Sequence, residues 1–144
     1  EEALGFVPTD NGWEARGEAR GGLYAYDPPP AERALRGAGT VHHVAWGTPM
    51  NRLERWRTAA TDAGAYATPV IDRFYFRSVY FREPSGVLFE LAPLGPGFAV
   101  DEDPEHLGES LSLPPAFEHV RDQVERSLTP LPDIRRWRPA GAAR

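Results

Sequence analysis

The chain has 144 residues, of which 41% are hydrophobic, so it can build one ordinary domain or two small repeated units with a buried core. A formal net charge of −5 without any basic stripe argues against nucleic-acid binding, and the lack of cysteine excludes disulfides, thiolate nucleophiles and zinc–thiolate sites. No apolar run reaches the roughly 18 residues of a membrane span and no signal peptide is visible, so we expect a cytoplasmic protein without membrane association.

Residues 1–27 are interpreted as the trailing part of a repeated unit. The segment "EEALGF" is typical of the last turn of a helix, with Gly5 at the C-cap position. The segments "GWEARGE" and "GGLYAYD" indicate two short strands, which gives a helix–strand–strand order. Residues 28–39 are predicted to be a linker, because three consecutive prolines cannot join a strand ladder.

Residues 40–93 are predicted to form a complete unit of strand, helix and three strands. The first strand is expected over 40–47, with Thr48 and Pro49 starting the helix that Gly64 ends. Three apolar runs rich in Val, Phe, Tyr and Ile follow, and they indicate the remaining strands. The first 27 residues would then be a shortened copy of the same unit.

Residues 94–144 are expected to form a C-terminal extension of loops and helices. The segment "PPAFEHVRDQVERSL" reads as one amphipathic helix, and the tail that follows it is polar and expected to be flexible. His106 and His119 lie in these polar segments and are interpreted as solvated.

Two adjacent histidines in "TVHHVAW" cannot face the same side of a strand. Val44 and Trp46 share a face with His42, and that face is expected to pack on the helix. His43 shares its face with the small Ala45, which leaves room in front of its imidazole. His43 is therefore predicted to face a cavity, whereas His42 is assigned to the core or to orienting its neighbour.

The hairpin "SVYFREPSGVLFEL" brings a carboxylate into an apolar strand. "EPSG" is a type I turn signal with Gly86 at a bulge position, so Glu83 is expected to pair with Val87 and Tyr80 with Glu90. A lone carboxylate in "VLFELA" is costly to bury unless it has a partner, and a metal ion is such a partner. Glu90, His43 and a nearby phenol indicate an oxygen–nitrogen site suited to Fe(II) or Mn(II).

These segments, together with "TPVIDRFYFRSVYFREPSGVLFELA" and "GPGFAVDED", resemble the ring-cleaving (extradiol-type) dioxygenases of the vicinal oxygen chelate superfamily. That superfamily includes glyoxalase and bleomycin-resistance proteins. The resemblance covers roughly residues 3 to 131 and is strongest to the C-terminal half of hydroquinone- and catechol-type enzymes. It implies an α+β fold of paired βαβββ modules that form an open cup-shaped mixed sheet, here with an incomplete first module and a helical C-terminal extension.

The resemblance implies roles for three residues. His43 and Glu90 match metal ligands, and Tyr80 matches the catalytic tyrosine that contacts the substrate hydroxyl. Such enzymes hold Fe(II), or Mn(II) or another divalent metal, with two His and one Glu, and act with O2 on a small aromatic diol. The second metal histidine belongs to a strand that would precede Glu1. We therefore expect a fragment of a longer bacterial protein, associated with the missing N-terminal half, or a homodimer that shares the site.

Other interpretations stay open. One is a glyoxalase-type metal isomerase or lyase, and another is a metal-free, resistance-type protein that binds a small aromatic molecule in the same cup. The family's acid/base histidine also has no counterpart, because "GLYAYDPPP" offers only tyrosines and an aspartate. Arg73 and Tyr75 could line the cup, although a surface arginine and a core tyrosine explain them more simply.

Overall fold

The computed structural model describes residues 2–18, 20–32, 35 and 37–130. The α+β class is confirmed, because two sheets and two α-helices form in the described residues. The chain divides into two compact units, residues 1–100 and residues from 101 onward. No helix in the described part of the chain is both long and apolar enough to cross a membrane.

The first sheet has three antiparallel strands in sequence order: β1 (Val7–Thr9), β2 (Gly12–Arg16) and β3 (Gly21–Tyr24). A short 3-10 helix, η1 (Glu2–Leu4), precedes it, and Gly5 follows this helix with a positive φ, as expected for its C-cap. Strands β2 and β3 were predicted. Strand β1 was not predicted, because its Val-Pro-Thr sequence is short and its proline has no N–H to donate to a strand ladder.

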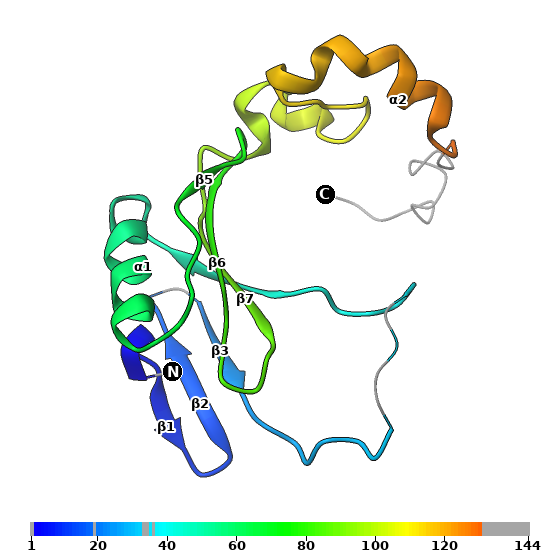
Figure 1. The fold of residues 1–144 in the computed structure, drawn as a ribbon. Helices are drawn as coiled ribbons and strands as arrows, with labels where there is room; N and C mark the ends of the chain where they lie inside the picture. Colours follow the sequence, from blue (N-terminus) through cyan, green and yellow to red (C-terminus); the bar gives the residue numbers. More distant parts are fainter. Residues whose placement is uncertain (1, 19, 33–34, 36, 131–144) are drawn as a thin grey trace, which may run out of the picture. The chain divides into compact units, whose positions relative to one another are not determined.

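The second sheet has four strands in the order β4-β7-β6-β5 and lies beside helix α1 (Figure 1). Its elements are β4 (Val44–Thr48), α1 (Leu53–Asp62), β5 (Ile71–Asp72), β6 (Arg77–Arg82) and β7 (Leu88–Pro93). Strand β4 pairs with β7 in parallel, and the other pairs are antiparallel. The strand–helix–three-strand order predicted for residues 40–93 is therefore observed.

The boundaries of the first strand and of its helix differ from the prediction. The strand begins at Val44 instead of residue 40, and Thr48 is its last residue instead of a helix cap. Pro49 caps a 3-10 turn, η2 (Met50–Arg52), which leads into α1. Proline disfavours helical φ/ψ in the residue before it, so Thr48 stays extended and the helix starts later.

The hydrophobic core lies between α1 and one face of the four-stranded sheet. Leu53 and Ala60 of the helix pack against alternating residues of β6 and β7, among which Val79 and Phe89 are almost fully buried. Trp46 on β4 also contacts this cluster, so the face assigned to Val44 and Trp46 is the packed one, as predicted. The opposite face of the sheet is therefore left for other roles.

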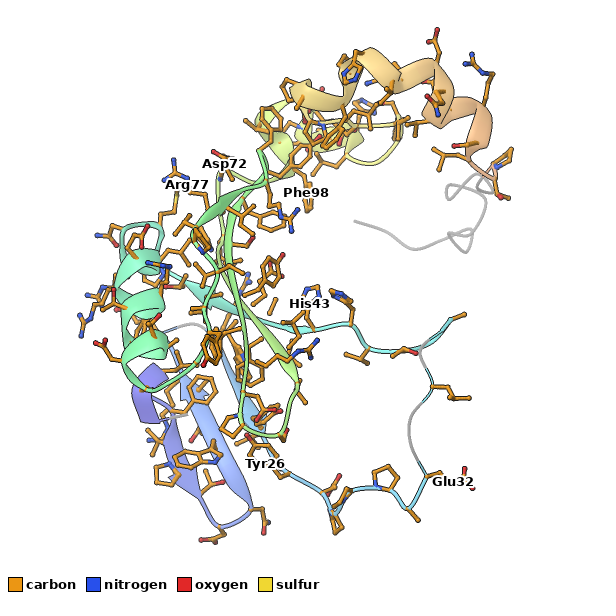
Figure 2. All side chains as sticks on the ribbon, viewed as in Figure 1. Tyr26, Glu32, His43, Asp72, Arg77 and Phe98 are labelled. Carbon is orange, nitrogen blue, oxygen red and sulfur yellow. The ribbon has the colours of Figure 1, made fainter. Side chains whose placement is uncertain are left out.

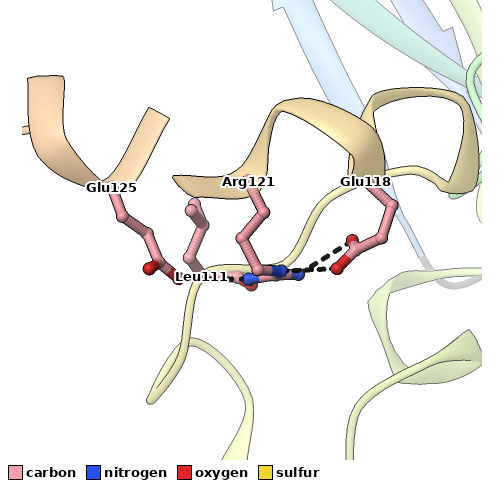
Figure 3. Close-up of polar contacts among 4 residues, drawn as sticks. All are labelled: Leu111, Glu118, Arg121 and Glu125. Carbon is pink, nitrogen blue, oxygen red and sulfur yellow. Dashed lines mark hydrogen bonds and ion pairs between the residues drawn. The ribbon is translucent and has the colours of Figure 1, made fainter. Parts of the chain in front are cut away.

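The second unit contains short helices, η4 (Pro104–His106), η5 (Pro115–Val120) and α2 (Arg121–Ser127), preceded in the first unit by η3 (Phe98–Val100). The single amphipathic helix predicted here is instead a 3-10 segment followed by a short α-helix. Arg121 joins these segments by donating to Glu118, Glu125 and the Leu111 carbonyl (Figure 3). The hydrogen bond with Glu118 raises the pKa of Arg121. Of the tail predicted over 129–144, residues 131–144 lie outside the described residues.

Candidate metal centre

Glu90 is a buried carboxylate on the sheet face opposite α1. Only 4% of its surface is exposed, and it pairs across the hairpin with Tyr80 and across the parallel ladder with Ala45. The predicted Tyr80–Glu90 register is thus confirmed, as is the Glu83–Val87 closing pair, where the Glu83 amide donates to the Val87 carbonyl. We call the face that carries Ala45, Tyr80 and Glu90 the site face.

The hairpin turn explains this register. Gly86 has a φ of 94°, a left-handed conformation that glycine adopts without strain, and its amide donates to the Glu83 carbonyl. Glu83 itself is 5% exposed and accepts hydrogen bonds from the Ser85 and Val87 amides, the Ser85 hydroxyl and the Tyr26 hydroxyl. The turn is therefore closed by local contacts as well as by the strand ladder.

His43 lies just before β4 and reaches the same carboxylate. Its Nε2 is 2.8 Å from Glu90 Oε2, and about a third of its side chain is exposed. Figure 2 shows His43 on the side of the sheet away from α1. The parallel pairing of β4 with β7 brings these two residues together, since Ala45 lies opposite Glu90 and His43 precedes it on the same face.

His42 is exposed, so its assignment to the core is wrong. The strand starts only at Val44, and His42 therefore lies outside the sheet. The alternative of orienting its neighbour fits the geometry, because the two Nδ1 atoms are 2.9 Å apart and one must donate to the other. When both rings are neutral and His43 donates its Nε2 proton to Glu90, His43 Nδ1 has no proton. It therefore accepts a hydrogen bond from His42 Nδ1. A metal on His43 Nε2 would reverse that direction, because a ligating nitrogen carries no proton.

Tyr80 completes the contacts of the carboxylate. Its hydroxyl donates to Glu90 Oε1 over 2.6 Å, so both carboxylate oxygens are engaged. The Tyr80 backbone is bonded to Thr68, whose hydroxyl accepts from the Tyr80 amide and whose amide donates to the Tyr80 carbonyl. Arg57 of α1 in turn donates to the Thr68 carbonyl, which connects the helix to the site through a short chain of hydrogen bonds.

Tyr75 and Arg73, which the sequence suggested could line the cup, lie in different environments. Tyr75 is buried, which fits the simpler interpretation as a core tyrosine. The guanidinium of Arg73 lies 5.6 Å from the centre of the Tyr80 ring, so this exposed arginine belongs to the surroundings of the site. Sequence reasoning did not find the Thr68 contacts, because they depend on pairing between residues that share no local motif. His106 is exposed and pairs with Glu109, and His119 is also exposed.

The donor atoms fit a divalent metal. Two ligand atoms bound at right angles to one ion, at about 2.1 Å each, lie about 3 Å apart, which is close to the 2.8 Å between His43 Nε2 and Glu90 Oε2. A nitrogen and a carboxylate oxygen suit Fe(II) and Mn(II). Within the described residues, no cluster of three or more His, Cys, Asp or Glu side chains is arranged to hold an ion. Only His43 and Glu90 of the predicted triad are therefore brought together.

Comparison with known proteins points to one class of enzyme. The chain is 43% identical over 103 residues to MhqA of Bacillus subtilis (strain 168), which is named as a ring-cleaving dioxygenase. The match covers 71% of this chain and 32% of MhqA. It is 37% identical over 105 residues to the chlorohydroquinone/hydroquinone 1,2-dioxygenase of Sphingobium indicum. That match covers 71% of this chain and 32% of the Sphingobium protein. No protein-family model matches the chain.

A solved structure agrees with these relatives. The crystal structure of a protein from Bacillus subtilis, titled as a dioxygenase, superposes with a TM-score of 0.68 at 44% identity. The superposition covers 72% of this chain and 34% of the other. The chain spans about a third of the length of the curated relatives it matches. In sequence and fold it is thus similar to part of proteins named as ring-cleaving dioxygenases.

Proposed function

We propose that this chain supplies half of the active site of a metal-dependent, extradiol-type ring-cleaving dioxygenase that acts on a small aromatic diol. The observation that carries the proposal is the buried Glu90 carboxylate in contact with His43 Nε2 and the Tyr80 hydroxyl. The names of the relatives support the same reaction, with a hydroquinone as the diol. The expected protein is cytoplasmic and belongs to the vicinal oxygen chelate superfamily.

In this proposal His43 and Glu90 are two metal ligands. Fe(II) bound there would supply the redox chemistry by which O2 is added to the aromatic ring. A third ligand is expected from outside the described residues, from a preceding segment or a second copy of the chain. A negative carboxylate and a neutral imidazole leave the ion with net positive charge, which favours binding of a deprotonated diol.

The other residues orient the ligands and the substrate. The Tyr80 hydroxyl holds Glu90 Oε1, so the other oxygen stays directed at His43. His42 bonded to His43 Nδ1 restricts rotation of that ring. Tyr80 is also the residue proposed to contact a substrate hydroxyl, and the guanidinium of Arg73 near its ring favours the ionised form of a bound phenol.

Metal analysis of three variants tests the proposal. Protein loaded with Fe(II) without oxygen and desalted is expected to retain metal, whereas His43→Ala and Glu90→Gln are expected to lose it. His106→Ala is the matched control, because His106 is an exposed histidine paired with a glutamate in the second unit. Full metal content in either site variant would contradict the ligand assignment, provided that circular dichroism shows a folded chain.

Oxygen uptake then tests the reaction. The loaded protein is expected to consume O2 with a hydroquinone or a catechol when a second copy of the chain completes its metal site. Metal binding without uptake on either diol would favour the glyoxalase-type alternative. Tight binding of an aromatic ligand without metal would favour the resistance-type binding protein.

A further inference from the structure

A cavity of about 520 Å³ opens beside the candidate metal centre. The hairpin turn between β6 and β7 forms one wall, and the residues that lead into β4 form the other. His43 belongs both to this cavity and to the contact with Glu90, so the cavity borders one of the two proposed metal ligands. Its volume exceeds that of a single benzene ring, which leaves space for a substituent.

The lining of the cavity combines apolar surface with positive charge. Val41, Val87 and Leu88 offer apolar contacts, and Arg82, His42 and His43 offer cationic or hydrogen-bonding groups. None of the described residues that line it is acidic. Such a lining favours an aromatic ligand with a negative substituent over a neutral one.

Arg82 is placed to bind that substituent. It lies on β6 two residues after Tyr80 and opposite Leu88, so it projects from the site face at a distance of about 7 Å along the strand. Its Nη1 donates to the Gly86 carbonyl over 2.7 Å, which holds the guanidinium at the cavity wall. Among the described residues, no carboxylate pairs with Arg82, and its other N–H groups remain available.

We propose that Arg82 forms an anion subsite that binds a carboxylate on the aromatic substrate. Guanidinium and carboxylate groups match in geometry and form two parallel charge-assisted hydrogen bonds. The substrate class is then a ring diol that carries a carboxylate, with the hydroxyls toward His43 and the carboxylate toward Arg82 and the hairpin turn. This inference rests on the proposed function for the identity of the diol, but the subsite can be tested without turnover.

Equilibrium binding of two probes tests the subsite. 2,5-Dihydroxybenzoate and hydroquinone share the diol and differ in the carboxylate, and EDTA in the buffer prevents binding through a metal. The full chain is expected to bind the carboxylated probe about tenfold more tightly or better at low salt, with the preference reduced at 1 M salt. Equal affinities, or no binding of either probe, would overturn the proposal.

Variants of two arginines on β6 provide the control. Arg82→Gln is expected to abolish the preference and Arg82→Lys to retain part of it. Arg77→Gln is expected to leave it unchanged, because Arg77 is exposed and does not line the cavity. The ratio of two affinities on one variant cancels any general loss of folded protein. A preference that survives in Arg82→Gln would overturn the proposal. A preference without any O2 uptake would leave the subsite standing and contradict the proposed reaction.

Discussion

At the scale of single residues, Glu90 is the group whose environment demands a functional explanation. Removing a carboxylate from water costs several kcal/mol unless its oxygens find partners, and both oxygens of Glu90 do. A phenol and an imidazole are weaker partners than a cation, however. A buried carboxylate held only by a phenol and an imidazole is suited to bind a metal ion through the oxygen that faces His43.

Tyr80→Phe tests the role of the phenol at this scale. The change removes one hydrogen bond to Glu90 Oε1 and the proposed contact with a substrate hydroxyl. Because His43 and Glu90 remain, metal content is expected to be unchanged. The turnover number for O2 uptake is expected to fall by about 10- to 100-fold.

The matched control is Tyr66→Phe, since the side chain of Tyr66 is 99% exposed. Unchanged turnover in Tyr80→Phe would show that the hydroxyl neither orients the ligand nor touches the substrate. Loss of metal in the same variant would instead show that the Tyr80 hydroxyl is needed to position Glu90 for metal binding.

At the scale of elements, the β6–β7 hairpin sets the register of the site, and Glu83 closes its turn. Burial raises the pKa of this carboxyl, but hydrogen bonds from Ser85, Tyr26 and Val87 outweigh burial, and the pKa is lowered overall. The folded protein therefore binds this proton less readily than the unfolded chain does. The stability that Glu83 contributes is present above about pH 4.3 and is lost as the pH falls through the lowered pKa.

Glu83→Gln is expected to reduce the free energy of unfolding at pH 7 by about 1–3 kcal/mol, because an amide cannot accept from all of these donors. The difference from the original chain is expected to shrink below about pH 4.3. Urea denaturation at a series of pH values measures both effects. Glu54→Gln on the exposed surface of α1 serves as the control, and a pH-independent difference would contradict the account.

At the scale of the whole molecule, aromatic contacts join the two sheets of the first unit. Trp46 on β4 contacts Phe6 at 4.8 Å and Phe89 at 5.7 Å between ring centres, and Tyr24 on β3 contacts Phe89 at 5.2 Å. The three-stranded sheet is therefore packed on the core of the four-stranded one. The two sheets should unfold together.

Trp46→Ala is expected to lower the free energy of unfolding by about 3–5 kcal/mol, because it empties the centre of this cluster. Trp46→Phe is expected to cost much less, since it keeps a ring and removes an indole N–H that is buried without a hydrogen-bond partner. Denaturation followed by far-ultraviolet circular dichroism measures both. A second, separate transition in the original chain would show that the sheets do not fold as one unit.

The sequence by itself determined those features that depend on short-range rules. Alternation counted back from Ala45 placed His43 on the same face as Glu90, and the "EPSG" turn set Tyr80 opposite Glu90, because side-chain parity and turn geometry act over a few residues. The order of strands and helix over residues 40–93 was also predictable from apolar runs and helix-ending glycine. The roles of His43, Glu90 and Tyr80 stay predictions until metal and activity are measured.

Only the tertiary structure decided which distant groups meet. The parallel pairing of β4 with β7 brings His43 Nε2 to Glu90, and the start of β4 at Val44 leaves His42 in solvent beside its neighbour. The position of Arg73 near Tyr80 and that of Arg82 at a cavity wall likewise depend on how the strands pack. Such contacts join residues far apart in the chain, so no local pattern specifies them, and the fold must be known before the chemistry of the site can be assigned.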